Sequence, residues 1–251
     1  MCRMLAYSGT IDDAGSALRE FRRLAEEGSV PVGVSPGHKD GWGILCYEKD
    51  RPKELGRRTG NAASDELYVN AINEAARVLP RILLVHLRKA SPGVSISLEN
   101  TQPFQRSSWV FAHNGTIWSP KFKRDSGRSD SVIFFENLLE NIQRRPDSEM
   151  MNQRILKEVK QLRKMIVANP DANGRTYTSI TFILSDGNSL WVLRDYSDDR
   201  DGDYYTMYYL RSSDGTLFCQ QKIIPGNWKT LENKRMAIVN QENELEIAEC
   251  L

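Results

Sequence analysis

The sequence predicts a layered α+β fold with mostly antiparallel sheets, and three observations lead to this prediction. Strand and helix patterns mix over the first two thirds of the chain, and from residue 177 onward only strand patterns remain. The regular strand–helix alternation typical of a parallel α/β fold is missing. Turn dipeptides such as Asp186-Gly187 and Asp214-Gly215 separate several of the late strands, as in an antiparallel meander. No repeat or low-complexity linker marks a boundary, so we expect one domain over residues 1–251.

The first third of the chain predicts three strands and two helices. Residues 2–8 form a short apolar run typical of a buried strand, and 41–48 and 81–88 have the same character. Residues 12–27 instead place apolar side chains three and four positions apart, which predicts a helix that stops at Gly28. The same spacing recurs over residues 65–79. The Pro- and Gly-rich stretch between the first helix and the second strand predicts a loop.

The remaining elements follow by the same criteria. SSWVFAH at 107–113 predicts a strand, and residues 130–143 and 150–167 each show a helical period. The basic stretch 121–128 is interpreted as a solvated loop, with a mobile lid as the alternative. The late strands are predicted in TYTSITFIL, SLWVLRD, DYYTMYYLR, TLFCQQK, KRMAIV and ELEIAE.

Composition excludes several classes of function. The 34 basic and 33 acidic residues nearly balance, which gives no electrostatic footprint for nucleic acid or for an anionic membrane. No apolar run approaches the roughly 18 residues that span a bilayer, and Arg3 interrupts any signal-peptide core. Four cysteines without C-x-x-C spacing and three histidines predict free thiols, a cytoplasmic location and no metal site. No phosphate-binding loop or dinucleotide fingerprint occurs, so we expect no cofactor.

The beginning of the chain, MCR, carries the first candidate for chemistry. If Met1 is removed, Cys2 becomes the first residue and bears both a thiol and a free α-amine. An α-amine has a pKa of about 7.7–8.0, so it can serve as the base for the thiol on its own residue. Alone, Cys2 is better explained as a small apolar residue that starts a strand, because many chains contain an incidental cysteine.

Three further stretches each place a polar group beside an apolar run. In AHNGT (112–116), Asn114 offers an amide donor, and Gly115 can turn its N–H outward in a backbone conformation that other residues avoid. Two such donors form an oxyanion hole, although Asn-Gly is also an ordinary turn. In HLRKAS (86–91), Arg88 can grip a carboxylate or simply end a strand in solvent. In RSDS (128–131), Asp130 can accept from an ammonium group or stabilise a helix start.

Taken together and in this order, these stretches resemble the class II glutamine amidotransferases, which are N-terminal-nucleophile hydrolases. GHKDGWGI (37–44), NTQPF (100–104) and TFILSDGNSLWVLRD (181–195) are similar to the stand-alone members, such as the ergothioneine-pathway amidohydrolase and a fungal glutathione-degradation subunit. The resemblance covers nearly the whole chain. It implies a four-layer αββα sandwich of two mostly antiparallel sheets.

The resemblance also implies roles for individual residues. Cys2 would be the nucleophile, and Asn114 and Gly115 would form the oxyanion hole. The α-carboxylate and α-amine of the substrate would be bound by Arg88 and Asp130, with Ser91 beside the carboxylate. His86 and His113 match family positions, and we interpret both as satisfied structural supports of strand ends.

Two departures bear on the substrate. Gln102 stands where relatives commonly have His in N-x-H-P-F, so any titratable role is lost at that position. Pro92 follows Ser91 where synthase-linked domains often have His.

Three functions remain open from the sequence. The first is hydrolysis of the side-chain amide of glutamine or of a γ-glutamyl compound, with the ammonia either released or passed to a separate synthase. The partner is then either that synthase or a second copy of the chain. The second is a non-catalytic γ-glutamyl or amino-acid binding subunit. It is favoured if Met1 is retained, because the Cys2 nitrogen is then an amide and no base. The third is a processing peptidase, which fits less well because an internal peptide offers Asp130 no free ammonium.

Overall fold

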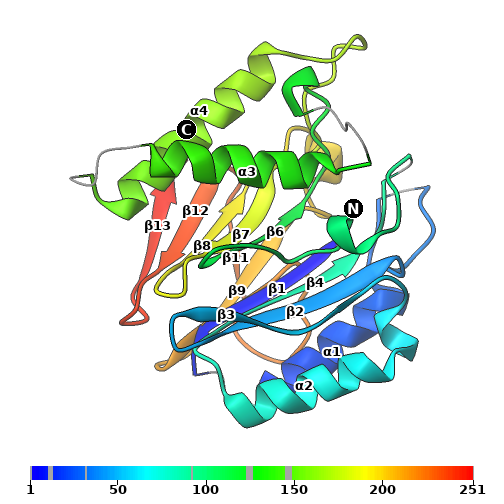
Figure 1. Ribbon diagram of the computed structural model, residues 1–251, viewed down its shortest axis with the longest axis vertical. Coiled ribbons are helices and arrows are strands. Elements are labelled where there is room, and N and C mark those ends of the chain that lie inside the picture. The colour runs from blue at the N-terminus through cyan, green and yellow to red at the C-terminus, as the bar shows by residue number, and fades with distance from the viewer. Residues whose placement is uncertain are drawn as a thin grey trace.

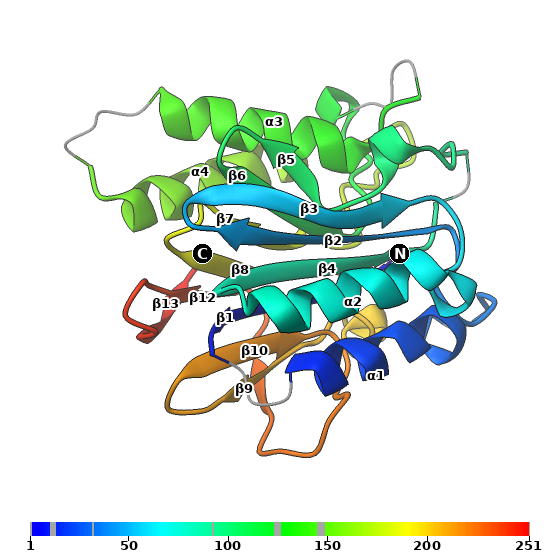
Figure 2. The ribbon, with the colours of Figure 1, turned by 60° about the horizontal axis from the view of Figure 1, so that its bottom comes forward.

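The computed structural model describes residues 2–10, 14–31, 33–91, 93–122, 127–144 and 149–250. Two β-sheets lie face to face, and each is covered on its outer side by a pair of helices (Figures 1 and 2). Every strand pair among the described residues is antiparallel, which confirms the prediction of mostly antiparallel sheets. The fold is therefore the expected α+β sandwich of four layers.

The first sheet has seven strands in the order β11-β9-β10-β1-β4-β2-β3. Its strands are β1 (Arg3–Gly9), β2 (Gly41–Glu48), β3 (Arg51–Arg58), β4 (Ile82–Arg88), β9 (Met207–Arg211), β10 (Gly215–Cys219) and β11 (Lys229–Leu231). Helices α1 (Ala14–Glu27) and α2 (Glu66–Val78) pack on its outer face, where Phe21 of α1 and Tyr68 of α2 join a cluster that includes Val85 of β4. The side chain of Asp65 accepts from the Leu67 N–H and so begins α2.

The second sheet has six strands in the order β13-β12-β8-β7-β6-β5. Its strands are β5 (Phe104–Arg106), β6 (Trp109–Asn114), β7 (Thr181–Ser185), β8 (Leu190–Arg194), β12 (Arg235–Val239) and β13 (Leu245–Glu249). Helices α3 (Asp130–Gln143) and α4 (Met151–Ala168) cover its outer face. Figure 1 shows α3 running across this sheet.

Side-chain alternation along the strands explains how one end of the sandwich becomes polar. Met4 and Ala6 point into the apolar layer between the sheets, whereas Leu5 and Tyr7 point toward α1 and α2. The same period of two places Cys2, His86 and Arg88 on the inner face of the first sheet. On β6, Val110 and Ala112 face inward, which places Asn114 on the inner face as well.

Several element bounds differ from the sequence predictions. Strand β3 is half-exposed at the sheet edge and rich in charge, so it lacks the apolar signal of a strand. Strands β5 and β11 have three residues each and were likewise not predicted. The expected strand over TYTSITFIL is shorter, because only β7 forms a ladder and Tyr177 and Ser179 make isolated bridges. Residues 12–13 of the first predicted helix and 123–126 of the basic stretch lie outside the described residues.

Within the part of the chain that the structure describes, no helix is long and apolar enough to cross a membrane.

Candidate active site

A small hollow lies where the beginning of β1 and the ends of β4 and β6 meet the first turn of α3. We call it the Cys2 hollow. Its volume is about 30 Å³, room for one or two water molecules. Six of the eight residues singled out from the sequence line it, namely Cys2, Arg88, Ser91, His113, Gly115 and Asp130. Asn114 and His86 are the two that do not, and both are buried.

Cys2 and Asn114 hold each other by a reciprocal pair of hydrogen bonds. The Cys2 backbone nitrogen donates to Asn114 Oδ1 at 2.8 Å, and Asn114 Nδ2 donates back to the Cys2 carbonyl at 2.9 Å. The Tyr204 hydroxyl donates to the same carbonyl at 3.0 Å. The thiol lies 3.8 Å from the Lys89 carbonyl oxygen. These contacts fix the Cys2 backbone, and the residue lines the hollow.

The Cys2 thiol is electrostatically unusual. Burial alone raises the pKa of this thiol, but the positive charge at the start of the chain and the neighbouring His86 lower it to about 6 from an ordinary value of 9.0. Burial instead raises the pKa of the other buried cysteines, to about 11 at Cys46 and about 12 at Cys219 and Cys250. Cys2 is therefore the cysteine whose surroundings favour the nucleophilic thiolate.

His86 is buried on β4 and differs from the prediction of a satisfied core histidine. Neither ring nitrogen has a well-formed hydrogen bond to a residue that the structure describes. The register of the sheet pairs His86 with Met4 and with Gly43, on the inner face that also carries Cys2. Because its ring nitrogens are not used by other described residues, the imidazole can interact with the nearby Cys2 thiol or with bound water.

His113 has contacts on both ring nitrogens. Its Nδ1 lies 2.8 Å from Ser131 Oγ, and its Nε2 lies 3.2 Å from the Ser179 carbonyl. A carbonyl can only accept, so Nε2 carries the proton and Nδ1 accepts from the serine hydroxyl. Burial lowers the pKa of His113 to about 4, although the nearby Asp130 and the Ser179 carbonyl oppose this shift. The ring is therefore neutral near pH 7.

Arg88 ends β4 with its guanidinium buried. Its Nη2 donates to the Ser95 carbonyl at 2.9 Å, whereas its buried Nη1 has no partner among the described residues. Burial lowers the pKa of Arg88, but a guanidinium stays charged near neutral pH. The β1–β4 register, continued by one residue, sets Cys2 opposite Arg88. Ser91 contributes a hydroxyl that lies 3.3 Å from Thr116 Oγ1.

Asp130 is the first residue of α3 and not its cap. The cap is Ser129, whose hydroxyl accepts from the Val132 N–H at 3.4 Å. Asp130 Oδ2 accepts from the Ile117 backbone N–H at 2.6 Å, and the residue is buried beside the hollow. The hollow therefore has one buried cation and one buried carboxylate in its wall.

Gly115 is required for a reason that the sequence did not reveal. We expected its backbone to adopt a conformation that other residues avoid, but its φ does not lie in the left-handed region. A Cβ at this position would instead meet the Ser179 carbonyl oxygen at 1.8 Å. The close approach of the loop before β7 therefore excludes any side chain.

Four buried residues at the site were not assigned a role from the sequence. Gln220 Oε1 accepts from Asn114 Nδ2 and from the Met4 N–H, both at 3.1 Å. Gln102 Oε1 accepts from the His113 N–H at 2.5 Å. Tyr204 and Asn100 complete the set. The NTQPF stretch signalled two of them, whereas no local pattern marks Tyr204, which precedes β9, or Gln220, which follows β10.

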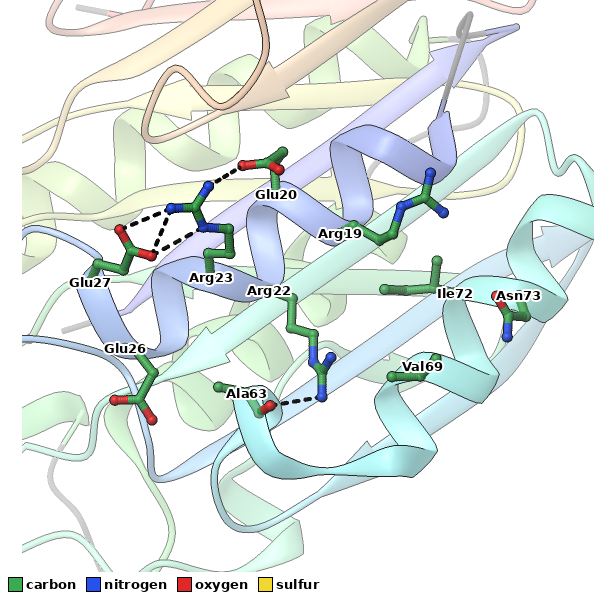
Figure 3. Close-up of a pocket in the computed structure, with 10 residues that line it drawn as sticks. All are labelled: Arg19, Glu20, Arg22, Arg23, Glu26, Glu27, Ala63, Val69, Ile72 and Asn73. Carbon is green, nitrogen blue, oxygen red and sulfur yellow. Dashed lines mark hydrogen bonds and ion pairs between the residues drawn. The ribbon is translucent and has the colours of Figure 1, made fainter.

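Within the described residues, neither a metal-ligand cluster nor the hollow between α1 and α2 forms a second centre. Among residues with described positions, no cluster of three or more His, Cys, Asp or Glu could hold a metal ion. A larger hollow of about 360 Å³ lies between α1 and α2 on the outer helical layer (Figure 3). Its charged side chains already pair locally, Arg23 with Glu20 and Glu27, and Arg22 with the Ala63 carbonyl. It contains none of the residues singled out above.

The layered fold, with a cysteine starting an inner strand beside an H-N-G strand end, defines a class of protein. The family model for class II glutamine amidotransferases matches residues 1–215. The chain therefore belongs to the class II glutamine amidotransferases.

Individual relatives are distant. A putative glutamine amidotransferase of Escherichia coli K12, YafJ, is 30% identical over 156 residues, which are 58% of this chain and 56% of that protein. The alignment thus spans less than two thirds of this relative.

Solved structures share the fold. Glutamine phosphoribosylpyrophosphate amidotransferase from B. subtilis superposes with a TM-score of 0.66 at 15% identity, over 100% of this chain and 49% of that one. A class II domain protein from Silicibacter pomeroyi gives a TM-score of 0.62 at 20% identity, over 99% of both chains.

Proposed function

We propose that this protein hydrolyses the side-chain amide of glutamine or of a γ-glutamyl compound, with Cys2 as the nucleophile. The observation that carries the proposal is the Cys2–Asn114 pair, which holds the Cys2 nitrogen at 2.8 Å from an acceptor beside a hollow lined by a buried arginine and a buried aspartate. When Met1 is removed, that nitrogen becomes an α-amine already oriented by Asn114 Oδ1. Membership of the family supports the same reaction class.

The first chemical step uses the Cys2 amine as the base. It takes the thiol proton, and the thiolate attacks the side-chain carbonyl carbon of the substrate to form a tetrahedral oxyanion. The C–N bond then breaks, and the leaving nitrogen takes the proton and departs as ammonia or an amine. A γ-glutamyl thioester remains on Cys2. Water attacks this thioester, the C–S bond breaks, and glutamate and the free thiol are released.

The oxyanion would be stabilised by Asn114 Nδ2 and the Gly115 backbone N–H. In the resting structure the two Nδ2 protons are directed to the Cys2 carbonyl and to Gln220 Oε1. The hydrogen bond from Asn114 Nδ2 to Gln220 can be given up at low cost, because Gln220 Oε1 still accepts from the Met4 N–H. A small rotation of either amide would then turn one Nδ2 proton toward the developing charge.

Recognition of the amino-acid end would fall to Arg88 and Asp130. Arg88 Nη1, which has no partner among the described residues, offers a donor to an α-carboxylate, with Ser91 nearby. The Asp130 carboxylate would accept from the α-ammonium group. A site with two buried charges of opposite sign discriminates against simple amides, because an absent partner leaves a charge uncompensated.

The proposal includes no cofactor, and the substrate is a small molecule. The chain carries no nucleotide-binding signature with which it could activate an acceptor, so ammonia is either released or passed to a separate synthase. We propose that the protein works without nucleic acid or membrane.

The test is glutamate release by Cys2→Ala, compared with Cys46→Ala as a buried-cysteine control. Protein with Met1 removal verified by intact mass is given glutamine and a panel of γ-glutamyl amides. We expect Cys2→Ala to lose release of glutamate and Cys46→Ala to retain it. Full activity in Cys2→Ala would overturn the proposal. Binding of glutamine without turnover, in protein that retains Met1 in its native host, would instead favour the amino-acid binding subunit.

A further inference from the structure

The Cys2 carbonyl accepts two hydrogen bonds, and one of the donors is a residue that the proposed reaction does not use. Asn114 Nδ2 donates to this oxygen at 2.9 Å, and the Tyr204 hydroxyl donates to it at 3.0 Å. Tyr204 is buried and lies 202 positions from Cys2 in the sequence. A carbonyl oxygen has two lone pairs, so both donors can bind at once. The Cys2 main chain is therefore held from two sides.

Arg3 clamps Tyr204 in place. Its guanidinium carbon lies 4.3 Å from the centroid of the Tyr204 ring, a distance typical of a cation over an aromatic face. Arg3 Nη1 also donates to the Tyr204 carbonyl at 2.9 Å, and Nη2 donates to the Ser29 carbonyl at 2.7 Å. Arg3 is fully buried and directly follows Cys2 in the MCR stretch. The residue next to Cys2 in the chain thus fixes the tyrosine that contacts Cys2.

His38, from the GHKDGWGI stretch, faces the Tyr204 hydroxyl as an acceptor. Its Nδ1 lies 3.1 Å from the Leu24 carbonyl, which can only accept, so Nδ1 carries the proton and Nε2 does not. Burial lowers the pKa of His38 to about 3, and the ring is neutral near pH 7. Nε2 lies 3.5 Å from the Tyr204 hydroxyl. The hydroxyl proton therefore lies between two acceptors, and the shorter contact is to the Cys2 carbonyl.

The Asn114 amide creates the need for a second donor to Cys2. Its two Nδ2 protons belong to one planar group, and they are directed to the Cys2 carbonyl and to Gln220 Oε1. A rotation that turns one proton toward the oxyanion therefore also moves the other relative to the Cys2 carbonyl. With Asn114 as sole donor, this buried carbonyl would lose its hydrogen bond as the oxyanion forms, which is unfavourable. Burial raises the pKa of the Tyr204 hydroxyl, so it keeps its proton near neutral pH and remains a donor.

We propose that Tyr204 is a positioning residue, whose hydroxyl keeps the Cys2 carbonyl hydrogen-bonded while Asn114 turns an Nδ2 proton to the oxyanion. Arg3 and His38 hold that hydroxyl in place. The inference rests on the proposed function, because attack on an amide carbonyl is the step that develops an oxyanion. Tyr204 acts on a main-chain oxygen and transfers no proton in the reaction.

The resting state and the transition state depend differently on Tyr204. In the resting structure Asn114 also donates to the Cys2 carbonyl, so removal of the hydroxyl leaves one donor in place. In the transition state Asn114 is directed to the oxyanion, and removal of the hydroxyl leaves the carbonyl without its second support. Alkylation by iodoacetamide displaces iodide at a CH₂ group and develops no oxyanion. Loss of the hydroxyl should therefore slow amide hydrolysis and spare both substrate binding and alkylation.

The test is Tyr204→Phe, which keeps the aromatic ring that stacks on Arg3 and removes only the hydroxyl. Glutamate release and the iodoacetamide rate of Cys2 are measured on protein with Met1 removal verified by intact mass. We expect kcat to fall about tenfold, with KM and the iodoacetamide rate within about twofold of the wild type. The matched control is Tyr47→Phe, which removes a buried hydroxyl that donates to two main-chain carbonyls, each at 2.8 Å. All three quantities should stay at the wild-type level in the control.

An unchanged kcat in Tyr204→Phe overturns the inference. An equal fall in kcat and in the iodoacetamide rate also overturns it, because this result indicates a displaced Cys2 and not a loss confined to the oxyanion step. If Tyr204→Phe fails to fold, Arg3→Lys decides, because it keeps the hydroxyl and removes the planar group that stacks on the ring. A fall in kcat of about threefold with an unchanged iodoacetamide rate is then expected, and an unchanged kcat refutes the inference.

Failure of the proposed function gives a different result. If the wild type releases no glutamate from glutamine or from any γ-glutamyl amide tested, the proposed function fails and the inference about Tyr204 fails with it. If the wild type is active and Tyr204→Phe has the same kcat, only the inference is refuted.

Discussion

The pH dependence of Cys2 reactivity gives the most quantitative prediction. A thiol with the ordinary pKa of 9.0 is about 1% thiolate at pH 7, whereas one with a pKa of about 6 is about 90% thiolate. The gain in nucleophile is thus roughly 90-fold. A less basic thiolate is also less nucleophilic, by about 15- to 30-fold for three pKa units at a Brønsted slope of 0.4–0.5. The net acceleration at pH 7 is therefore only a few-fold, and the midpoint of the pH profile is the decisive quantity.

The assay uses protein that retains Met1, the form to which this pKa applies, and measures the rate of iodoacetamide alkylation of Cys2 from pH 4.5 to 9.5. Peptide mass mapping separates Cys2 from the other thiols. We expect the rate to rise with pH, to reach half its plateau near pH 6 and to be flat above pH 7.5. His86→Gln should move the midpoint upward, because His86 contributes to the lowered pKa. A midpoint at pH 8 or above in the wild type, or an unshifted midpoint in His86→Gln, would refute the electrostatic reasoning.

Four further predictions concern single residues at the site. Asn114→Ala should reduce kcat by about 10²–10³ with little change in KM, and steady-state kinetics showing less than a threefold drop would exclude it as an oxyanion donor. Arg88→Lys should raise KM for glutamine about tenfold because a point charge replaces the planar fork, and an unchanged KM would argue against carboxylate binding there. Gly115→Ala should destabilise the fold by about 1–3 kcal/mol and abolish turnover, because its Cβ would meet Ser179 O at 1.8 Å; equal stability to urea would contradict this. His113 has a pKa of about 4 in the folded state and about 6.5 in the unfolded state, so the unfolded state binds more protons between these two pH values. The free energy of unfolding therefore falls as the pH is lowered through 6.5, by about 2 kcal/mol between pH 7 and 5. In urea unfolding, His113→Gln should lose this part of the pH dependence.

The sequence predicted the layered fold because its apolar periodicity is strong where burial is complete. The strands at β1, β2, β4 and β6 are buried along nearly their whole length, and their apolar runs are visible without a structure. Strand β3 is the opposite case. Its conformation is dictated by pairing with β2 and not by its own residues, so RPKELGRR carries no strand pattern.

The site shows the same division between local and long-range information. Motifs next to strand ends indicated the residues that line the Cys2 hollow, because alternation and register bring those ends together. The contacts that orient these side chains could not be predicted from the sequence. Gln220 contacts Asn114 although the two residues lie 106 positions apart in the sequence. Gly115 must lack a side chain because tertiary packing places the carbonyl of Ser179, 64 residues later, against it. The His86 ring has no well-formed hydrogen bond among the described residues, and this too is a property of its surroundings that has no sequence signal.

The central claim is that Cys2 is the nucleophile of a site that recognises the glutamyl group. Its most direct test is trapping with the diazo-ketone analogue of glutamine on protein whose Met1 removal is verified by intact mass, with glutamine and γ-glutamyl peptides as competitors. The account predicts a single adduct that maps to Cys2 and is suppressed by at least one competitor, which also identifies the preferred substrate class. No adduct on a free N-terminal cysteine, or an adduct that no γ-glutamyl compound suppresses, would contradict it.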